Sequence, residues 1–248
     1  MTQEERLIEL EEYVRTHGKV TLEFICERFG ISYDSARRDL VKLGEFPGIL
    51  RIRGGAIVNE SKTSLSYTQR DNADPVKVNL AAKAAQLVER NDIVFLDAGT
   101  TNTLIAQHLE VESSVITNSL ESLNLLSHKT QIKKCILGGM FDQFSHAILG
   151  NMTIDHIKKY QADRAFIGVS ALSECGITTD AELDANLKVA MAEQSKQVIC
   201  VAKSDKFNTQ LLYQSCTWQD IDCLITDKKP PHSILKQLEH YDVELILI

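Results

Sequence analysis

Residues 32–43, SYDSARRDLVKL, and the preceding residues 22–29, LEFICERF, form the pattern that decides the fold at the start of the chain. Ser32 is a favourable N-cap, and apolar side chains then recur every three or four residues, as on one face of a helix. The earlier segment has the same spacing, and Gly30 supplies a turn between the two. Two short helices joined by a short turn with glycine are typical of a helix-turn-helix.

The segments on either side of this motif complete the prediction of a winged helix over residues 1–58. Apolar residues at helical spacing predict a first helix over about residues 2–16. After the third helix, residues 49–58 read ILRIRGGAIV, two short strands around a pair of glycines, which indicates a β-hairpin. Arg51 and Arg53 alternate along this wing, so both side chains are expected on one face of it.

The helix-turn-helix and the wing carry the candidate contacts to double-stranded operator DNA. They are Ser32, Tyr33, Asp34, Ser35, Arg37, Arg38, Lys42, Arg51 and Arg53. The start of a recognition helix approaches base edges, so Arg37 is expected to contact guanine bidentately, whereas flanking cations and hydroxyls hold phosphates. Arg38 has an alternative role in a salt bridge with Asp39 or Glu45. An alternative interpretation of the whole segment is a small helical domain that does not bind DNA and whose charged face is solvated.

The charge distribution permits DNA binding without requiring it. The chain has 27 Lys and Arg, 34 Asp and Glu and a net charge of −7. Residues 35–57, however, hold five Lys and Arg against two Asp and Glu. Screening confines the field of a charged group to about 8–10 Å, so a local basic surface acts independently of the acidic remainder.

Several other classes of protein find no support in the sequence. The acidic, amphipathic start is unlike a signal peptide, and no apolar run approaches the ~18 residues of a membrane span. A cytoplasmic location without a membrane partner is therefore expected. Six cysteines are scattered and seven histidines lack metal-binding spacing, so we expect neither a metal nor a cofactor.

Residues 59–75 are polar and predict a linker, after which residues 76–248 alternate between strands and helices. Seven strands are expected, at residues 93–97, 114–118, 134–138, 164–169, 197–202, 222–226 and 243–248. Several are continuous apolar runs, which is typical of strands buried on both faces, and helical patterns separate many of them. The expected fold of this larger part is α/β, a doubly wound and mainly parallel sheet.

Polar residues follow several of these strands, at the edge where ligands of such sheets bind. Gly99, Thr100 and Thr101 enter a helix after the first strand, and this combination is suited to holding an anion. The candidate effector-binding residues at this edge are Asp97, Gly99, Thr100, Thr101, Thr117, Asn118, Ser119, Gly138, Gly139 and Lys206. Glycine and threonine are also ordinary helix caps, but their grouping at one edge favours a phosphate-bearing ligand.

Both parts of the chain resemble the DeoR-type regulators of bacterial sugar metabolism. In that family the recognition helix runs Val-Ser, two variable residues and Thr-Ile-Arg-Arg-Asp-Leu, and the wing ends in His-Gly-Gly-Ala. Here residues 31–40 read ISYDSARRDL and residues 53–56 read RGGA, and LDAGTT, ITNS, LGG and SDKF follow in the family's order. The effector domain of the family is related in fold to sugar-phosphate isomerases.

The resemblance implies roles for single residues of the larger part. Residues 99–101 would cradle a phosphate, with Lys206 as its cationic partner. Asp97 and Asn118 would meet sugar hydroxyls.

The chain departs from the family after Gly176. Relatives often show a stretch like Glu-Glu-Ala-Glu-Val-Lys, whereas residues 183–188 here read LDANLK. Asp180, Glu182 and Asp184 either line the pocket or cap a helix, and we expect the cap.

The resemblance implies a DNA-binding transcriptional regulator, a repressor of a carbohydrate-utilisation operon whose DNA affinity is controlled by a phosphorylated sugar or a related metabolite. Paired DNA-binding heads on a palindromic operator favour a homo-oligomer, a dimer or a tetramer. No catalytic residue is expected. The alternative is a sugar-phosphate isomerase with a DNA-binding appendage, in which Asp97, Asp180, Glu182 and Lys206 supply the groups that transfer protons.

Overall fold

The chain forms two compact units, Met1–Ser61 and Lys62–Ile248. The computed structural model describes residues 2–44, 46, 49–58, 65–71 and 73–248. Residues 59–64, which belong to the expected linker, therefore lie outside the described residues. No helix within the described ranges is both long enough and apolar enough to cross a membrane.

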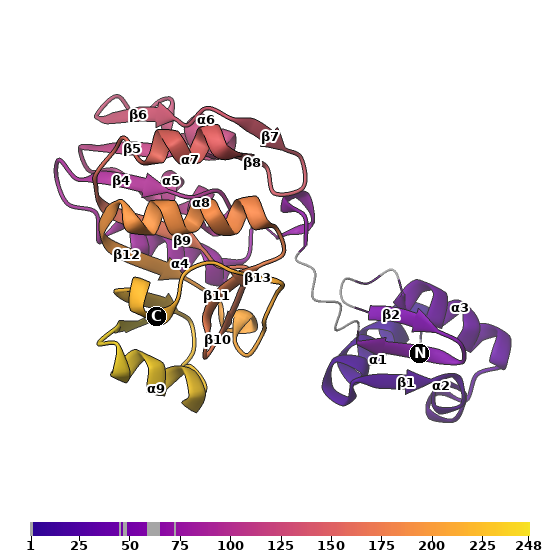
Figure 1. The fold of residues 1–248 in the computed structure, drawn as a ribbon. Coiled ribbons are helices and arrows are strands. Elements are labelled where there is room, and N and C mark those ends of the chain that lie inside the picture. The colour runs from indigo at the N-terminus through magenta and orange to yellow at the C-terminus, as the bar shows by residue number, and fades with distance from the viewer. Residues whose placement is uncertain (1, 45, 47–48, 59–64, 72) are drawn as a thin grey trace. The chain divides into compact units, whose positions relative to one another are not determined.

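The first unit is a winged helix (Figure 1). Its helices are α1 (Gln3–His17), α2 (Leu22–Phe29) and α3 (Tyr33–Leu43), and its strands are β1 (Lys19–Thr21), β2 (Ile49–Ile52) and β3 (Gly55–Val58). Ser32 caps α3, since its Oγ accepts the Ser35 backbone N–H at 3.3 Å, and Gly18 ends α1 in the left-handed conformation. Leu10 and Ile25 are fully buried in the core that joins the helices to the wing. The predicted helix-turn-helix and hairpin are confirmed.

The wing has one strand more than the sequence pattern predicts. Thr21 caps α2, but residues 19–21 also form β1, which pairs antiparallel with β3 in a sheet of order β1-β3-β2. Three residues are too few to show the alternation that indicates a strand. Gly55 suits this close pairing, because a Cβ there would collide with the carbonyl oxygen of Val20.

The second unit is built on a seven-stranded sheet in which every pair is parallel. Its strands are β4 (Ile93–Leu96), β5 (Ser113–Thr117), β6 (Ile132–Ile136), β9 (Ala162–Gly168), β12 (Ser195–Val201), β14 (Cys223–Thr226) and β15 (Glu244–Leu247). The order across the sheet is β15-β14-β12-β9-β4-β5-β6. The chain adds strands outward from β4 in one direction and from β9 in the other, so the order reverses between these two. All seven predicted strands are confirmed.

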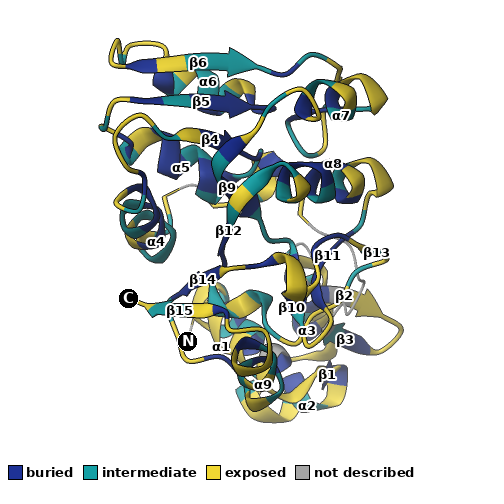
Figure 2. Cartoon of the chain, turned by 60° about the vertical axis from the view of Figure 1, so that its left-hand side comes forward, coloured by how far each residue is buried: buried dark blue, intermediate teal, exposed yellow. Residues whose placement is uncertain are grey.

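Helices cover both faces of this sheet (Figure 1). One face packs against α4 (Pro75–Ala85), α5 (Thr100–His108) and α6 (Leu120–Leu126), and the other against α7 (Asn151–Ile157), α8 (Glu182–Glu193) and α9 (His232–His240). Alternate residues of a strand point to opposite faces of the sheet. Val94 and Leu96 pack in the core with α4, α5 and α6, and Phe95 packs in the core with α7, α8 and α9. The inner strands are buried over most of their length (Figure 2). The predicted doubly wound α/β fold is confirmed.

The structure also has short elements that the sequence pattern does not predict. The short strands follow the carboxyl ends of β6, β9 and β12. β7 (Met140–Asp142) and β8 (Ala147–Leu149) form an antiparallel hairpin, and β10 (Ala171–Ser173), β11 (Gly176–Thr179) and β13 (Tyr213–Gln214) form a small antiparallel sheet. The 3-10 helices are η1 (Tyr67–Gln69), η2 (Ser204–Lys206) and η3 (Trp218–Asp220). Elements of two to four residues offer too few positions to show a period.

Candidate functional site

The predicted DNA-contacting residues lie on the solvent side of α3 and the wing. Ser35 is half-buried and the others are exposed, namely Ser32, Tyr33, Asp34, Arg37, Arg38, Lys42, Arg51 and Arg53. The helix position that follows Arg37 by one turn is Val41, whose side chain is also exposed. The outer face of α3 therefore presents polar, cationic and apolar groups to solvent together.

A hollow of about 540 Å³ lies between α3 and the wing. Arg37 from the helix and Arg51 and Arg53 from the wing contribute to its lining. The Leu22 backbone N–H donates to the Gly54 carbonyl at 2.8 Å, which fixes the turn of the wing against α2. Three guanidinium groups around one groove match the cationic footprint of a DNA-binding surface.

Arg38 does not form the salt bridge with Asp39 that was its alternative role. Asp39 is fully buried and accepts hydrogen bonds from Arg6 Nε and from Gln3 Nε2, each at 2.8 Å. Its two oxygens thus bind α3 to α1. The other suggested partner, Glu45, lies outside the described residues. Arg38 itself is exposed on the outer face of the helix.

The two neighbouring cations of α3 differ in their contacts. Arg37 Nη1 lies 3.8 Å from Asp34 Oδ1, and both side chains are more than half exposed, so this ion pair contributes only about 0–1 kcal/mol. Lys42 Nζ donates to Gln3 Oε1 at 2.9 Å, which directs it toward α1. Arg37 is therefore more readily available to DNA than Lys42.

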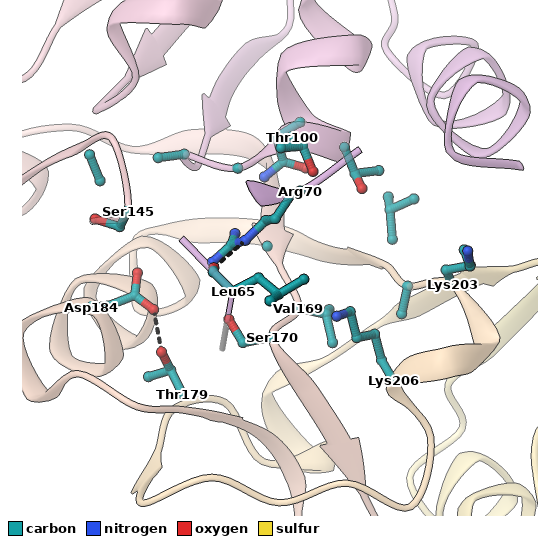
Figure 3. Close-up of a pocket in the computed structure, with 18 of the residues that line it drawn as sticks. Leu65, Arg70, Thr100, Ser145, Val169, Ser170, Thr179, Asp184, Lys203 and Lys206 are labelled. Atoms are coloured by element: carbon teal, nitrogen blue, oxygen red, sulfur yellow. Dashed lines mark hydrogen bonds between the residues drawn. The ribbon is translucent and has the colours of Figure 1, made fainter. Parts of the chain in front are cut away.

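In the second unit, a cavity of about 310 Å³ lies at the carboxyl ends of β4, β9 and β12. The strand order reverses between β4 and β9, which is the place where doubly wound sheets bind ligands. The lining comes from residues 65, 69–71, 98–102, 168–170, 201–203 and 205–206, with further residues from the β7–β8 hairpin and from α4 and α8 (Figure 3). Segments distant in sequence thus meet around one small volume.

The N-terminus of α5 borders this cavity. Gly99 precedes the helix at φ +141°, a conformation that favours glycine, and its carbonyl accepts the Thr103 N–H at 2.8 Å. Thr100, Thr101 and Asn102 line the cavity. Backbone N–H groups in a first helical turn have no partner within the helix, so they are suited to binding an anion.

Three cations line the same cavity without forming an ion pair. They are Arg70, Lys77 and Lys206, and none has a carboxylate oxygen within 4.0 Å among the described residues. Lys77 Nζ lies 3.3 Å from Thr100 Oγ1, at the start of α5. Burial lowers the pKa of each of the three, and nearby carboxylates offset part of this effect, Asp184 for Arg70 and Asp205 for Lys206. Like-charge repulsion also lowers the pKa of the two lysines, since Lys206 acts on Lys77 and Arg70 on Lys206. A bound anion would relieve this repulsion.

A buried ion cluster forms part of the wall of the cavity. Lys188 binds Asp97 and lies 3.1 Å from Asp184 Oδ1. Asp97 also accepts the backbone N–H groups of Ala98, at 2.8 Å, and Gly168, at 2.9 Å. Burial alone would lower the pKa of Lys188, but the two carboxylates outweigh it and raise that pKa. Asp97 therefore joins the ends of β4 and β9 and neutralises Lys188.

The structure brings four of the ten predicted effector-binding residues to the cavity: Gly99, Thr100, Thr101 and Lys206. The other six, Asp97, Thr117, Asn118, Ser119, Gly138 and Gly139, are not among its lining residues. They hold the strand ends in place instead. Asn118 Oδ1 accepts the Ala98 N–H at 2.8 Å, and the Gly138 carbonyl accepts the Thr153 hydroxyl at 2.9 Å. A Cβ at Gly139 would collide with Thr153 Oγ1.

Other charged residues of the cavity lie on elements that the strand-end rule does not address. They include Arg70, Asp74, Lys77, Asp180, Asp184 and Lys188. Asp184 Oδ2 accepts the Thr179 hydroxyl at 2.7 Å, whereas Glu182 is exposed. The expectation that these acids cap α8 is wrong, because the N-cap is Ala181 and no side chain makes a capping hydrogen bond there.

Comparison with known proteins shows what the chain is similar to. A family model described as the DeoR C terminal sensor domain matches residues 73–228, and one described as a DeoR-like helix-turn-helix domain matches residues 6–62. The HTH-type transcriptional repressor GlcR of Bacillus subtilis (strain 168) is 38% identical over 250 residues, covering 100% of this chain and 97% of the relative.

Two further similarities were found, one to a curated relative and one to a solved structure. The glycerol-3-phosphate regulon repressor of Escherichia coli (strain K12) is 28% identical over 251 residues and 100% of both chains. Among solved structures, ribose 5-phosphate isomerase A from Methanocaldococcus jannaschii aligns with a TM-score of 0.40 and 18% identity over 56% of each chain. The two curated relatives carry the names of repressors.

Proposed function

Because this chain belongs to the DeoR family of transcriptional regulators, we propose that it represses a carbohydrate-utilisation operon and leaves its operator when a small phosphorylated sugar binds in the cavity. The chain is a DNA-binding regulator rather than an enzyme, and the sensor-domain match over residues 73–228 includes six of the seven strands of the parallel sheet. One relative supports a phosphate ester through its name, the glycerol-3-phosphate regulon repressor of Escherichia coli (strain K12).

One observation carries the choice of a phosphate ester as effector. Arg70, Lys77 and Lys206 line a single cavity together with the start of α5, and no carboxylate pairs with them among the described residues. Charge-assisted hydrogen bonds contribute roughly 1.5–3 kcal/mol each, and a phosphate dianion offers acceptors to several donors together. A volume of about 310 Å³ is at the lower end of the range for small-molecule sites, which favours a ligand of a few carbons.

The remaining lining provides partners for hydroxyl groups. Asp184 and Ser145 present carboxylate and hydroxyl oxygens at the side of the cavity opposite Lys203 and Lys206 (Figure 3). Asn102 Oδ1 has no hydrogen-bond partner in the described part of the chain. Sugar hydroxyls both donate and accept, so they suit such a mixed surface. We propose that the phosphate binds at the cationic side and the hydroxyls at this polar side.

For the DNA contacts, we propose that Tyr33, Asp34, Ser35 and Arg37 read base edges in the major groove. We propose that Arg38, Lys42, Arg51 and Arg53 hold phosphates or enter the minor groove. All of these side chains except the half-buried Ser35 are exposed, which supports this assignment. We further propose that the protein acts in the cytoplasm as a homo-oligomer, since two heads on a palindromic operator bind far more tightly than one. An effector then releases DNA only if it binds better to the arrangement that fits the operator poorly.

The test is a fluorescence-anisotropy titration of the full chain onto DNA from upstream of its own gene and neighbouring genes. The titration is repeated with glycerol 3-phosphate and with pentose and hexose phosphates. We expect specific binding that one of these compounds weakens. The matched control is the corresponding unphosphorylated polyol or sugar, which should have no effect because it lacks the dianion.

Two results would contradict the proposal. If the chain binds no DNA specifically under any condition, it does not recognise an operator in this DNA. If the unphosphorylated sugar releases the DNA at the same concentration, the effector does not need a phosphate group.

A further inference from the structure

Residues 65–71, which we call the strap, are docked on the second unit although the sequence predicts a linker there. Tyr67 is buried, its backbone N–H donates to the Phe144 carbonyl at 2.8 Å, and its hydroxyl lies 3.2 Å from Thr103 Oγ1 on α5. Its ring stacks on His146 with centroids 4.8 Å apart and planes 10° from parallel. The strap is thus attached to both the β7–β8 turn and α5.

The strap also provides part of the cavity lining. Leu65, Gln69, Arg70 and Asp71 are lining residues, whereas Tyr67 is not. Arg70 Nε donates to the Leu65 carbonyl at 2.8 Å, and its guanidinium lies in the middle of the labelled side chains, between Asp184 and Lys206 (Figure 3). The terminal nitrogens of Arg70 have no hydrogen-bond partner within the described ranges. Their position is therefore open to a ligand anion.

We infer that Arg70 is an effector-binding residue through which the strap couples the cavity to the DNA-binding unit. The phosphate binds Arg70 only while the strap is docked, so the effector stabilises the docked strap. This inference rests on the proposed function, because it concerns the same cavity and the same phosphate. It adds a residue to the site and a physical route from the site to the DNA-binding unit.

The route follows from the length of chain between the units. With the strap docked, residues 59–64 join it to the end of β3, and six residues reach at most about 20 Å. With the strap released, residues 59–71 form the connection, and thirteen residues reach at most about 45 Å. A docked strap therefore restricts how far two heads can separate to meet two half-sites. Because a ligand shifts a conformational equilibrium only through differential affinity, Arg70 is the contact that makes this shift possible.

The first test measures amide hydrogen exchange at residues 65–71 in the full chain, with inorganic phosphate and glycerol 3-phosphate as probes. We expect at least one probe to slow exchange about fivefold or more, the lower end of ordinary coupling between sites. Arg70→Gln should abolish the slowing. Thr68→Ala is the matched control, because Thr68 lies exposed on the strap and does not line the cavity. Unchanged exchange in the wild type with both probes would overturn the inference.

The second test separates coupling from simple binding. This test uses the sugar phosphate or glycerol 3-phosphate that releases operator DNA from the wild type, at a saturating concentration. The Thr68→Ala variant should release the operator DNA fully, whereas the Arg70→Gln and Tyr67→Ala variants should stay bound to it. A merely local role for Arg70 would weaken effector binding but leave release complete at saturation, and that result would overturn the coupling. Full release by Tyr67→Ala would overturn it as well, since Tyr67 docks the strap without lining the cavity.

Failure of the proposed function gives different results from failure of this inference. If the wild type binds no operator, or if none of the phosphorylated compounds releases the operator, the proposal of a repressor fails. The hydrogen-exchange test then decides the role of Arg70 by itself. Slower exchange that depends on Arg70 would then still support a strap that closes on a bound phosphate.

Discussion

The two charged regions of this protein present their cations in opposite ways. On α3 and the wing, Arg37, Arg38 and Arg51 are exposed side chains, and Arg37 and Arg51 border an open hollow. In the cavity, Lys77 and Lys206 are partly covered and their pKa values are lowered by burial. The first region suits a polyanion that brings many phosphates to a surface, and the second suits one phosphate that enters an enclosed volume.

This difference determines how strongly water and salt weaken the electrostatic interactions of each region. Exposed charges interact through water and are screened within about 8–10 Å at physiological salt, so each contributes little alone and their sum depends on salt. Charges that are partly desolvated are screened less and cost free energy when unpaired. Changes inside the cavity wall should therefore produce larger effects than changes on the DNA-facing surface.

The largest effect is expected from Asp97→Asn, which leaves the buried Lys188 without its closest carboxylate. Removing one partner of a buried ion pair costs about 3–5 kcal/mol, and the amide retains fewer acceptors for Ala98 and Gly168. The free energy of unfolding of the second unit, measured by urea titration, should fall by this amount.

Glu112→Gln is the control for this prediction. Glu112 pairs with Arg90 at 2.7 Å on the surface, and both side chains are more than half exposed, so its loss should cost at most about 1 kcal/mol. Equal losses in the two variants would show that the Asp97 cluster is no more important than a surface ion pair.

The next effect is expected from Lys206→Ala, which removes one cation of the cavity. Loss of one charge-assisted contact of roughly 1.5–3 kcal/mol predicts about 10- to 100-fold weaker effector binding, measured by calorimetry. Operator affinity without effector should remain unchanged. Lys229→Ala, at an exposed position outside the cavity, is the control. Normal release by a low effector concentration in Lys206→Ala would remove this lysine from the site.

Several parts of this picture are predictable from the sequence because they rest on local physics. Continuous apolar runs such as residues 93–97 indicate buried parallel strands, and a serine before an amphipathic segment indicates the start of a helix. The positions of Gly99 and Lys206 at the cavity are predictable because both residues follow strands, and strand ends converge in a parallel sheet. Short-range pattern and topology together therefore account for the fold and for one side of the cavity.

The other side of the cavity depends on tertiary contacts that no short-range pattern contains. Arg70 belongs to a polar segment that reads as a linker, and it reaches the cavity because Tyr67 docks on the turn at Phe144 and His146. Lys77 is one of two lysines of α4, and a lysine in an amphipathic segment is typical of a solvated helix face. Asp97 ends a strand as predicted, but both of its oxygens are engaged inside the protein: Oδ1 accepts the Ala98 N–H, and Oδ2 accepts the Gly168 N–H and binds Lys188.

On the DNA-facing surface, Arg37→Ala should weaken specific operator binding by about 1–3 kcal/mol, because a bidentate contact to guanine is worth this much. Its ion pair with Asp34 is long and exposed, so little folding stability should be lost. A gel-shift titration with the operator and with unrelated DNA measures the change. Unchanged operator affinity would exclude Arg37 from base contact.

The pH dependence of effector binding offers a smaller effect. The second ionisation of a phosphate ester has a pKa near 6, so affinity should fall by up to about tenfold as the pH is lowered from 7 to 5. At the alkaline end, affinity should fall as the pH rises through the lowered pKa values of Lys77 and Lys206, below the usual range for lysine. Affinity that is flat from pH 5 to 7 would indicate that the bound group is not a phosphate ester.

The smallest effect distinguishes two cations on the same helix. Arg38 is exposed, whereas Lys42 already donates to Gln3 at 2.9 Å on α1. If Arg38 holds a phosphate, Arg38→Ala should reduce the slope of log K against log salt concentration by about 1 on operator and unrelated DNA alike, and Lys42→Ala should change it less. Anisotropy titrations between 50 and 200 mM salt measure both slopes, over a range in which one unit of slope is about fourfold in affinity. A larger change for Lys42 would mean that its bond to Gln3 opens when DNA binds, and a loss confined to the operator would make Arg38 a base-reading residue.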